Sequence, residues 1–358
     1  MPEIKNRLAV TNGQLGVGLF LVSAGAILAL RPAGRLCAKY GSAPVMRVSA
    51  LVGAVLLPLI PAPTNIWLFG LCGFAFMFMT ATMDMAMNAH AVAIEHASQQ
   101  LFMGRLHGLW SVGGIAGGLL GGSFAAAGIP LAAQAIVMAG VVGLIAIAAG
   151  RLLLPADVDR HEPTEGSAKH RHPLLFWLLG LVTLCATVGE GSAMDWGAVL
   201  LRDEWNATPF VASIPYVVFQ TAMVIGRFST DALSKRIGRS RVLFGSGLLA
   251  TIGLTTGLLI GDVHGVALGW FLLGLGVSVV FPMMMSIAGA IAIRDYSGVI
   301  APSQAVSMVA GVAYAAFLAG PPLIGFLGDA ISLRWAMLLP AVLGFGFFAG
   351  ARVAKRID

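Results

Sequence analysis

Residues 131–172 read LAAQAIVMAGVVGLIAIAAGRLLL and then PADVDRHEPTEGSAKHRH, a mostly apolar run followed by the longest polar stretch of the chain. About 20 apolar residues in a helix suffice to cross the hydrocarbon core of a bilayer. Similar apolar runs fill the chain on both sides of the polar stretch. The pattern therefore predicts two membrane-embedded parts, 1–154 and 173–358, joined by a cytoplasmic linker at 155–172.

The composition excludes several classes of protein. The chain has 358 residues, of which 58% are apolar and 11% are charged, whereas a soluble domain carries roughly 25% charged residues. This balance argues against a soluble fold and against intrinsic disorder. The net charge of +6 does not indicate a nucleic-acid partner, because the basic residues lie in short loops between apolar runs. The three cysteines stand among apolar residues and predict core packing, with no metal and no cofactor.

Eleven apolar segments are candidate transmembrane helices, five before the linker and six after it. The fold class is therefore an all-α membrane protein. Prolines inside these segments, such as Pro58, Pro215, Pro282, Pro321 and Pro322, predict kinks. The segments are 13–36, 44–61, 65–90, 106–128, 130–154, 173–201, 208–233, 241–261, 263–292, 302–328 and 334–353.

The basic residues predict the orientation. If the C-terminus lies in the cytoplasm, 18 of the 22 Lys and Arg residues fall on the cytoplasmic side. Such an excess is typical of cytoplasmic loops. Eleven spans would then place the N-terminus outside.

An internal repeat relates the two parts. Positions 197 residues apart match in several spans, for example Thr11 with Thr208, Gly41 with Gly238 and Gly114 with Gly311. Parallel repeats are typical of transporters with a binding site near the membrane midplane. The span at 173–201 would pair with positions −24 to 4, so a first helix is missing from the repeat. We expect a misassigned start; the alternative is a protein that lacks this helix.

Glycines and basic residues recur around two turns. The first turn has Gly34, Lys39 and Gly41. The second has Gly226, Arg227, Asp231, Arg236, Gly238 and Arg239. With these turns, and with the stretches 83–89, 105–114 and 190–196, the chain resembles the major facilitator superfamily, in particular its YbjJ- and MosC-type bacterial permeases. The resemblance implies two pseudo-repeated bundles of twelve helices in all, the first of which is absent here.

Four side chains in the second part are candidates for substrate binding or proton coupling: Glu190, Asp195, Trp196 and Gln220. An ionisable residue inside a span costs about 3 kcal/mol, so Glu190 and Asp195 suggest function. Both are expected toward the outer half of their span. They lie about 140° apart around a helix, which predicts separate partners. Glu190 could instead hold a neighbouring helix, Gln220 could simply bond between helices, and Trp196 fits an interfacial aromatic belt better than a substrate stack.

A second group lies near the cytoplasmic ends of two spans and is a candidate inner gate: Asp84, Asn88, Arg105 and His107. Asp84 and Asn88 share a helix face. Ordinary solvation at the membrane surface is the alternative.

Together these features favour a secondary transporter of a small molecule, working by alternating access and coupled to protons. We expect a monomer in the bacterial inner membrane, with no enzymatic activity, since the polar groups lie at two depths and no phosphate-binding loop is present. A non-transporting membrane protein, a sensor or an inactive truncated carrier is the alternative.

Overall fold

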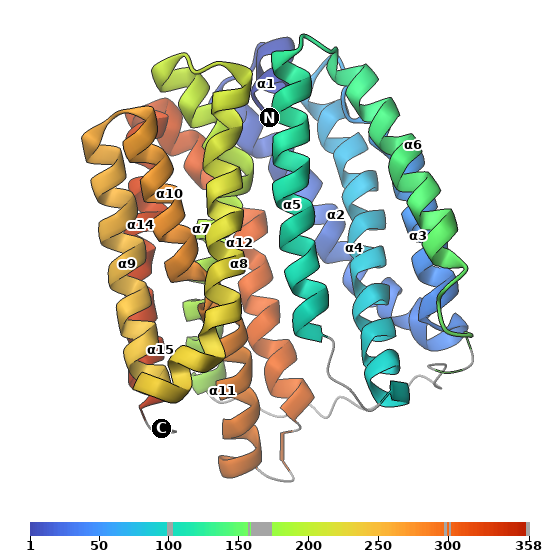
Figure 1. Cartoon of the computed structure of the whole chain (residues 1–358), viewed down its shortest axis with the longest axis vertical. Helices are drawn as coiled ribbons and strands as arrows, with labels where there is room; N and C mark the ends of the chain where they lie inside the picture. The colour runs from blue at the N-terminus through green and yellow to red at the C-terminus, as the bar shows by residue number, and fades with distance from the viewer. Residues whose placement is uncertain (99–102, 157, 159–173, 297–298, 301, 356–358) are drawn as a thin grey trace.

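A computed structural model describes the chain except residues 99–102, 157, 159–173, 297–298, 301 and 356–358, and describes no side chains at 95–97, 103–105, 107 and 302–304 (Figure 1). All regular elements of the described residues are helices. They are α1 Pro2–Leu8, α2 Asn12–Tyr40, α3 Ser42–Leu56 with the 3₁₀ turn η1 Leu57–Leu59, α4 Ile66–Ser98, α5 Met103–Ala126, α6 Leu131–Gly150, α7 Leu174–Trp205, α8 Pro209–Ile237, α9 Arg239–Ile260, α10 Val263–Ser278, α11 Val280–Asp295, α12 Pro302–Ile331, α13 Leu333–Ala336, α14 Leu338–Leu343, the 3₁₀ turn η2 Gly344–Gly346, and α15 Phe347–Ala354.

The described helices form eleven segments that are long and apolar enough to cross a membrane. They correspond to the eleven predicted spans, so this prediction is confirmed. Side chains such as Val55 and Leu144, 73% and 70% exposed, fit lipid around the helices. We call the two ends of the bundle the α1 end and the α15 end; the chain termini mark them in Figure 1.

Prolines explain one break in each of two predicted spans. A proline has no N–H for the carbonyl four residues before it. α10 ends at Ser278, four residues before Pro282, and α13 ends at Ala336, four residues before Pro340. α8 and α12 continue without a break through Pro215, Pro321 and Pro322, so the kinks expected at these residues stay a prediction.

The internal repeat is visible in the helix ends. α2 and α8 begin and end 197 residues apart, at Asn12–Tyr40 and Pro209–Ile237. α4 likewise matches the span formed by α10 and α11, which runs from Val263 to Asp295. α1 matches the last two turns of α7.

Unusual backbone angles repeat at the same spacing. Ala9 and Asn206 have φ of 50° and 48°, and Gly41 and Gly238 have φ of 83° and 85°. A positive φ is readily adopted by glycine alone, which explains why Gly41 and Gly238 recur at the turns after α2 and α8. The two repeats therefore share one backbone plan.

Contacts between the two repeats run mainly along two pairs of helices, α2 with α12 and α5 with α8 (Figure 1). Glycines permit the close approach in both pairs. A Cβ at Gly16 would lie 2.7 Å from the Pro321 carbonyl oxygen, and one at Gly122 would lie 2.5 Å from the Ser213 hydroxyl oxygen. Small residues at such positions let helix backbones pack closely where lipid gives no hydrophobic drive.

A carboxylate joins the repeats at the α1 end. Asp329 on α12 accepts hydrogen bonds from the backbone N–H groups of Asn12 and Gly13, at 2.9 and 2.8 Å. These groups open α2 and lack partners inside the helix. The negative charge also suits the positive end of the helix dipole. Asp329 therefore ties the start of α2 to the end of α12.

We expect Asp329→Ala to lower the free energy of unfolding by about 1–2 kcal/mol, the usual cost of losing a helix cap. Thermal unfolding of the purified protein in detergent measures this. Asp329→Asn keeps one acceptor oxygen and should lose less. An unchanged melting temperature for Asp329→Ala would show that the contact does not contribute to stability.

Candidate functional site

An ion pair lies inside the membrane-spanning region. The Arg227 guanidinium on α8 is 3.8 Å from the Glu190 carboxylate on α7, and it also donates a hydrogen bond to the Ser111 hydroxyl on α5 at 3.1 Å. The Arg227 and Glu190 side chains are 26% and 23% exposed, whereas Ser111 is fully buried. Because α5 belongs to the first repeat, Arg227 connects the repeats.

The depth of this pair differs from the prediction. Glu190 is the seventeenth of the 32 residues of α7, so it lies at the middle of the helix and not toward its outer half. The reason is that α7 extends to Trp205, four residues beyond the predicted end of the span. A midplane position is typical of transporter binding sites.

Hydroxyl and amide groups surround the pair. The Gln220 amide donates to the Tyr216 hydroxyl at 3.2 Å, both on α8. Tyr216 and Tyr314 lie within electrostatic range of the Glu190 carboxylate, and Tyr314 also lies within range of Asp84 on α4. α4, α7, α8 and α12 thus bring hydrogen-bonding groups and charges of both signs toward one region, which we call the central cluster.

Arg227 corrects the interpretation of the basic turn. It was expected in a cytoplasmic loop, but it lies inside α8, ten residues before the helix ends at Ile237. Gly34 and Lys39 lie in α2, while Gly226, Asp231 and Arg236 lie in α8. Gly41 and Gly238 alone form the turns, and Arg239 begins α9. The sequence did carry a signal, because Arg227 lies eight residues after Phe219 within an apolar segment. A cation in such a segment needs a partner inside the membrane.

Asp195 and Trp196 lie closer to the α1 end than Glu190 does. Asp195 is half-buried and does not share the Arg227 partner of Glu190, and it interacts electrostatically with the amino group of Met1. Trp196 is fully buried, which contradicts its assignment to an interfacial aromatic belt facing lipid headgroups.

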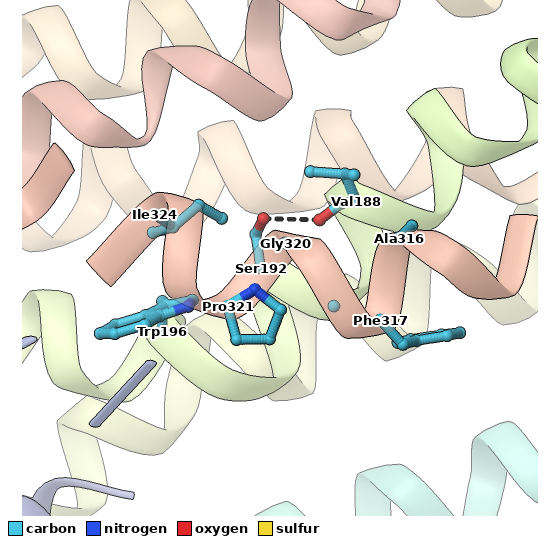
Figure 2. A pocket seen from close by; sticks show the side chains of 9 residues that line it. Val188, Ser192, Trp196, Ala316, Phe317, Gly320, Pro321 and Ile324 are labelled. Atoms are coloured by element: carbon cyan, nitrogen blue, oxygen red, sulfur yellow. Dashed lines mark hydrogen bonds between the residues drawn. The ribbon is translucent and has the colours of Figure 1, made fainter. Parts of the chain in front are cut away.

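Trp196 lines a small pocket between α7 and α12 (Figure 2). Its indole Nε1 has no hydrogen-bond partner among the described residues. The volume open to water is about 10 Å³, room for about one water molecule. A substrate ring therefore cannot stack on Trp196 in this conformation.

The predicted inner gate is described only in part. Asp84 and Asn88 are half-buried on α4, and the Asn88 amide donates to the Asp84 backbone carbonyl at 2.9 Å. This bond lies within one helix and joins nothing across the bundle. The side chains of Arg105 and His107 lie outside the described residues, so the gate stays a prediction.

The described residues offer no group of three or more His, Cys, Asp or Glu side chains that could hold a metal ion. The central cluster offers an ion pair and hydrogen-bonding groups.

Comparison with known proteins identifies the family. The family model described as Major Facilitator Superfamily matches residues 1–196 and 179–356. An uncharacterized MFS-type transporter of Yersinia pestis is 32% identical over 364 residues, covering 99% of this chain and 90% of that protein. The membrane protein MosC of Rhizobium meliloti is 30% identical, covering 96% of this chain and 82% of MosC.

Solved structures share the fold. The nucleoside transporter NupG superimposes with a TM-score of 0.76 at 13% identity, covering 97% of this chain and 92% of NupG. The fucose:proton symporter FucP of E. coli gives a TM-score of 0.63 at 17% identity, covering 98% and 93%. With family-model matches over nearly its whole length and relatives of about 30% identity, the chain belongs to the Major Facilitator Superfamily of membrane transporters.

Proposed function

We propose that this protein is a secondary transporter that moves a small solute by alternating access and couples the movement to protons. The observation that carries the proposal is the ion pair of Glu190 and Arg227 at mid-depth, with Ser111 of the other repeat bonded to the same guanidinium. A charged pair in a bilayer is expensive to keep, and its position between the repeats gives it a role in their relative movement.

Protonation of Glu190 is the proposed coupling step. A proton bound at a Glu190 carboxylate oxygen removes the negative charge that faces Arg227. The guanidinium then needs another acceptor, which a substrate hydroxyl or carbonyl in the central cluster can supply. Release of the proton restores the pair and favours release of the substrate, so the proton and the solute move together.

The central cluster favours a small, uncharged or weakly charged, hydroxyl-bearing substrate. Arg227 is the cation of the central cluster and is already paired with Glu190. Little positive charge is therefore left to balance the negative charges of a polyanion. Tyr216, Gln220 and Tyr314 supply hydrogen-bonding groups suited to hydroxyls. NupG and FucP, which are named for nucleosides and fucose, make these two classes the first to test.

The proposed setting is the bacterial inner membrane, with the protein as a monomer. The α15 end would face the cytoplasm, because it carries Arg31, Arg35, Arg236 and Arg239, members of the basic set that favours the cytoplasmic side. On this view the Asp329 contact lies on the outer side. We expect no enzymatic activity, since the polar groups serve binding and proton exchange.

We expect Glu190→Gln to abolish uptake driven by a pH gradient while leaving counterflow exchange, because the variant keeps the side-chain shape but cannot exchange a proton. Proteoliposomes assayed with radiolabelled L-fucose and uridine, with a pH-sensitive dye inside, measure both. Glu204→Gln is the control, since Glu204 accepts a hydrogen bond from the Arg334 backbone outside the central cluster. Gradient-driven uptake by Glu190→Gln at the level of the unmodified protein would remove Glu190 from coupling.

We expect Asp84→Asn to shift the protein toward the form open at the α15 end, because the variant removes the negative charge of the proposed inner gate. Gly311→Cys is a suitable reporter for maleimide labelling. A Cβ there meets nothing within 4 Å, and Gly311 shares a helix face with Tyr314. The native cysteines are replaced by serine first. Labelling from the α15 side should rise several-fold; equal labelling with and without Asp84→Asn would contradict the gate.

A further inference from the structure

A hollow of about 470 Å³ lies between α3 and α6, away from the central cluster. α3 and α6 pack together at one edge of the molecule (Figure 1). Among the described residues, the lining contains two cations and no carboxylate; it consists of Arg47, Leu51, Ala146, Ile147, Gly150 and Arg151. A volume of this size is in the range of small-molecule sites.

The lining separates charge from apolar surface by depth. Arg47 lies in the second turn of α3 and Arg151 directly follows α6, so both are near the α15 end. Leu51 and Ile147 lie four residues from these arginines, one helical turn deeper into the membrane region. They are 37% and 49% exposed. The hollow therefore offers a cationic level at the membrane surface and an aliphatic level below it.

The arginines keep donors for a ligand. Arg47 donates through Nε to the Gly150 carbonyl at 2.7 Å, which fixes its guanidinium against the end of α6. In the hydrogen bonds of the described residues, the other guanidinium nitrogens of Arg47 and all those of Arg151 are unused. A planar guanidinium matches phosphate oxygens with two parallel hydrogen bonds.

The second repeat has aromatic residues at the positions that correspond to the two arginines. The residues 197 positions after Arg47 and Arg151 are Phe244 and Phe348, whose rings stack with centroids 4.7 Å apart. In the second repeat an aromatic pair thus joins the helices where the first repeat presents two cations and a hollow.

Contacts of the neighbouring helices are similar in place in the two repeats. A Cβ at Gly143 would lie 3.9 Å from Ala54 in the first repeat, and Thr251, which is 197 residues after Ala54, bonds to the Ala341 carbonyl in the second. Ala341 is one residue past the counterpart of Gly143, and the span of the second repeat is broken here whereas α6 is continuous. The two repeats therefore differ at this place in side chains and in local backbone.

We propose that the hollow binds one anionic phospholipid, of the phosphatidylglycerol or cardiolipin type, with its phosphate on Arg47 and Arg151 and an acyl chain against Leu51 and Ile147. Basic pockets between transmembrane helices on the cytoplasmic side suit such headgroups. The site does not depend on the proposed transport activity, because it lies on the lipid-facing edge of the bundle.

The test is lipid binding to the full chain in neutral detergent, measured by native mass spectrometry with dioleoyl-phosphatidylglycerol and dioleoyl-phosphatidylcholine. Each arginine near a membrane surface contributes about 1 kcal/mol. Arg47→Gln with Arg151→Gln should therefore weaken phosphatidylglycerol binding by about thirtyfold, and Arg151→Gln alone by about fivefold. The single variant keeps the Arg47 bond to Gly150, so its loss of binding cannot come from that contact. Phosphatidylcholine binding should not change.

Two further variants are the controls. Arg31→Gln with Arg35→Gln removes the same charge from exposed positions on α2 and should leave binding unchanged. Arg47→Phe with Arg151→Phe copies the second repeat and should abolish selective binding while the melting temperature is kept.

Three results would overturn the proposal. The first is equal weakening by the α2 pair and the hollow pair, which would mean diffuse attraction to the basic surface. The second is displacement of the lipid by an equal concentration of soluble glycerol phosphate, which would mean a free-anion site. The third is unchanged binding in the double glutamine variant.

Discussion

A positive charge in the middle of a membrane-spanning helix is the constraint on which the central part of this structure depends. Arg227 lies ten residues before the end of α8, so its charge requires partners within the bundle. Glu190 supplies a carboxylate at 3.8 Å and Ser111 a hydroxyl at 3.1 Å. Because these partners come from α7 and α5, any change in the relative position of the two repeats changes the surroundings of the guanidinium.

The repeats provide a common backbone, and the charged residues make them different. The residues 197 positions before Arg227 and after Asp84 are Leu30 and Phe281. Arg47 and Arg151 correspond in the same way to the stacked Phe244 and Phe348. At each of these corresponding positions, one repeat has an apolar residue that can pack in lipid. The charged residue occurs in the other repeat. The two repeats therefore share a backbone plan but not their charged residues.

The sequence predicts the spans well because membrane helices must be apolar over a fixed length. All eleven segments, the repeat and the turns at Gly41 and Gly238 follow from local patterns. The partner of Glu190 does not, since pairing depends on how α7 and α8 face each other. Because Arg227 was assigned to a basic loop, its position inside a membrane-spanning helix was also missed. Trp196 shows the same limit. A tryptophan near the predicted end of a span gives the same sequence pattern in a lipid-facing belt and in a buried core, and Trp196 is buried.

Prolines mark a second limit of local patterns. Pro282 and Pro340 interrupt their helices four residues upstream, but Pro215 and Pro321 do not. The missing hydrogen bond is the same in each case, so the packing of neighbouring helices decides whether the chain breaks. The sequence shows where a proline removes a helix hydrogen bond, but it does not show whether the helix breaks there.

The most direct test of alternating access is a pair of distances measured by double electron–electron resonance in nanodiscs. One pair of spin labels at Trp67 and Ile331 reports on the α1 end, and another at Leu36 and Ile293 on the α15 end; all four side chains are exposed. Cys37, Cys72 and Cys185 form no disulfide bond with one another and are replaced first. The account predicts that acidification changes the two distances in opposite directions and that Glu190→Gln removes this response. Distances that stay fixed at both ends, or that change together, would contradict it.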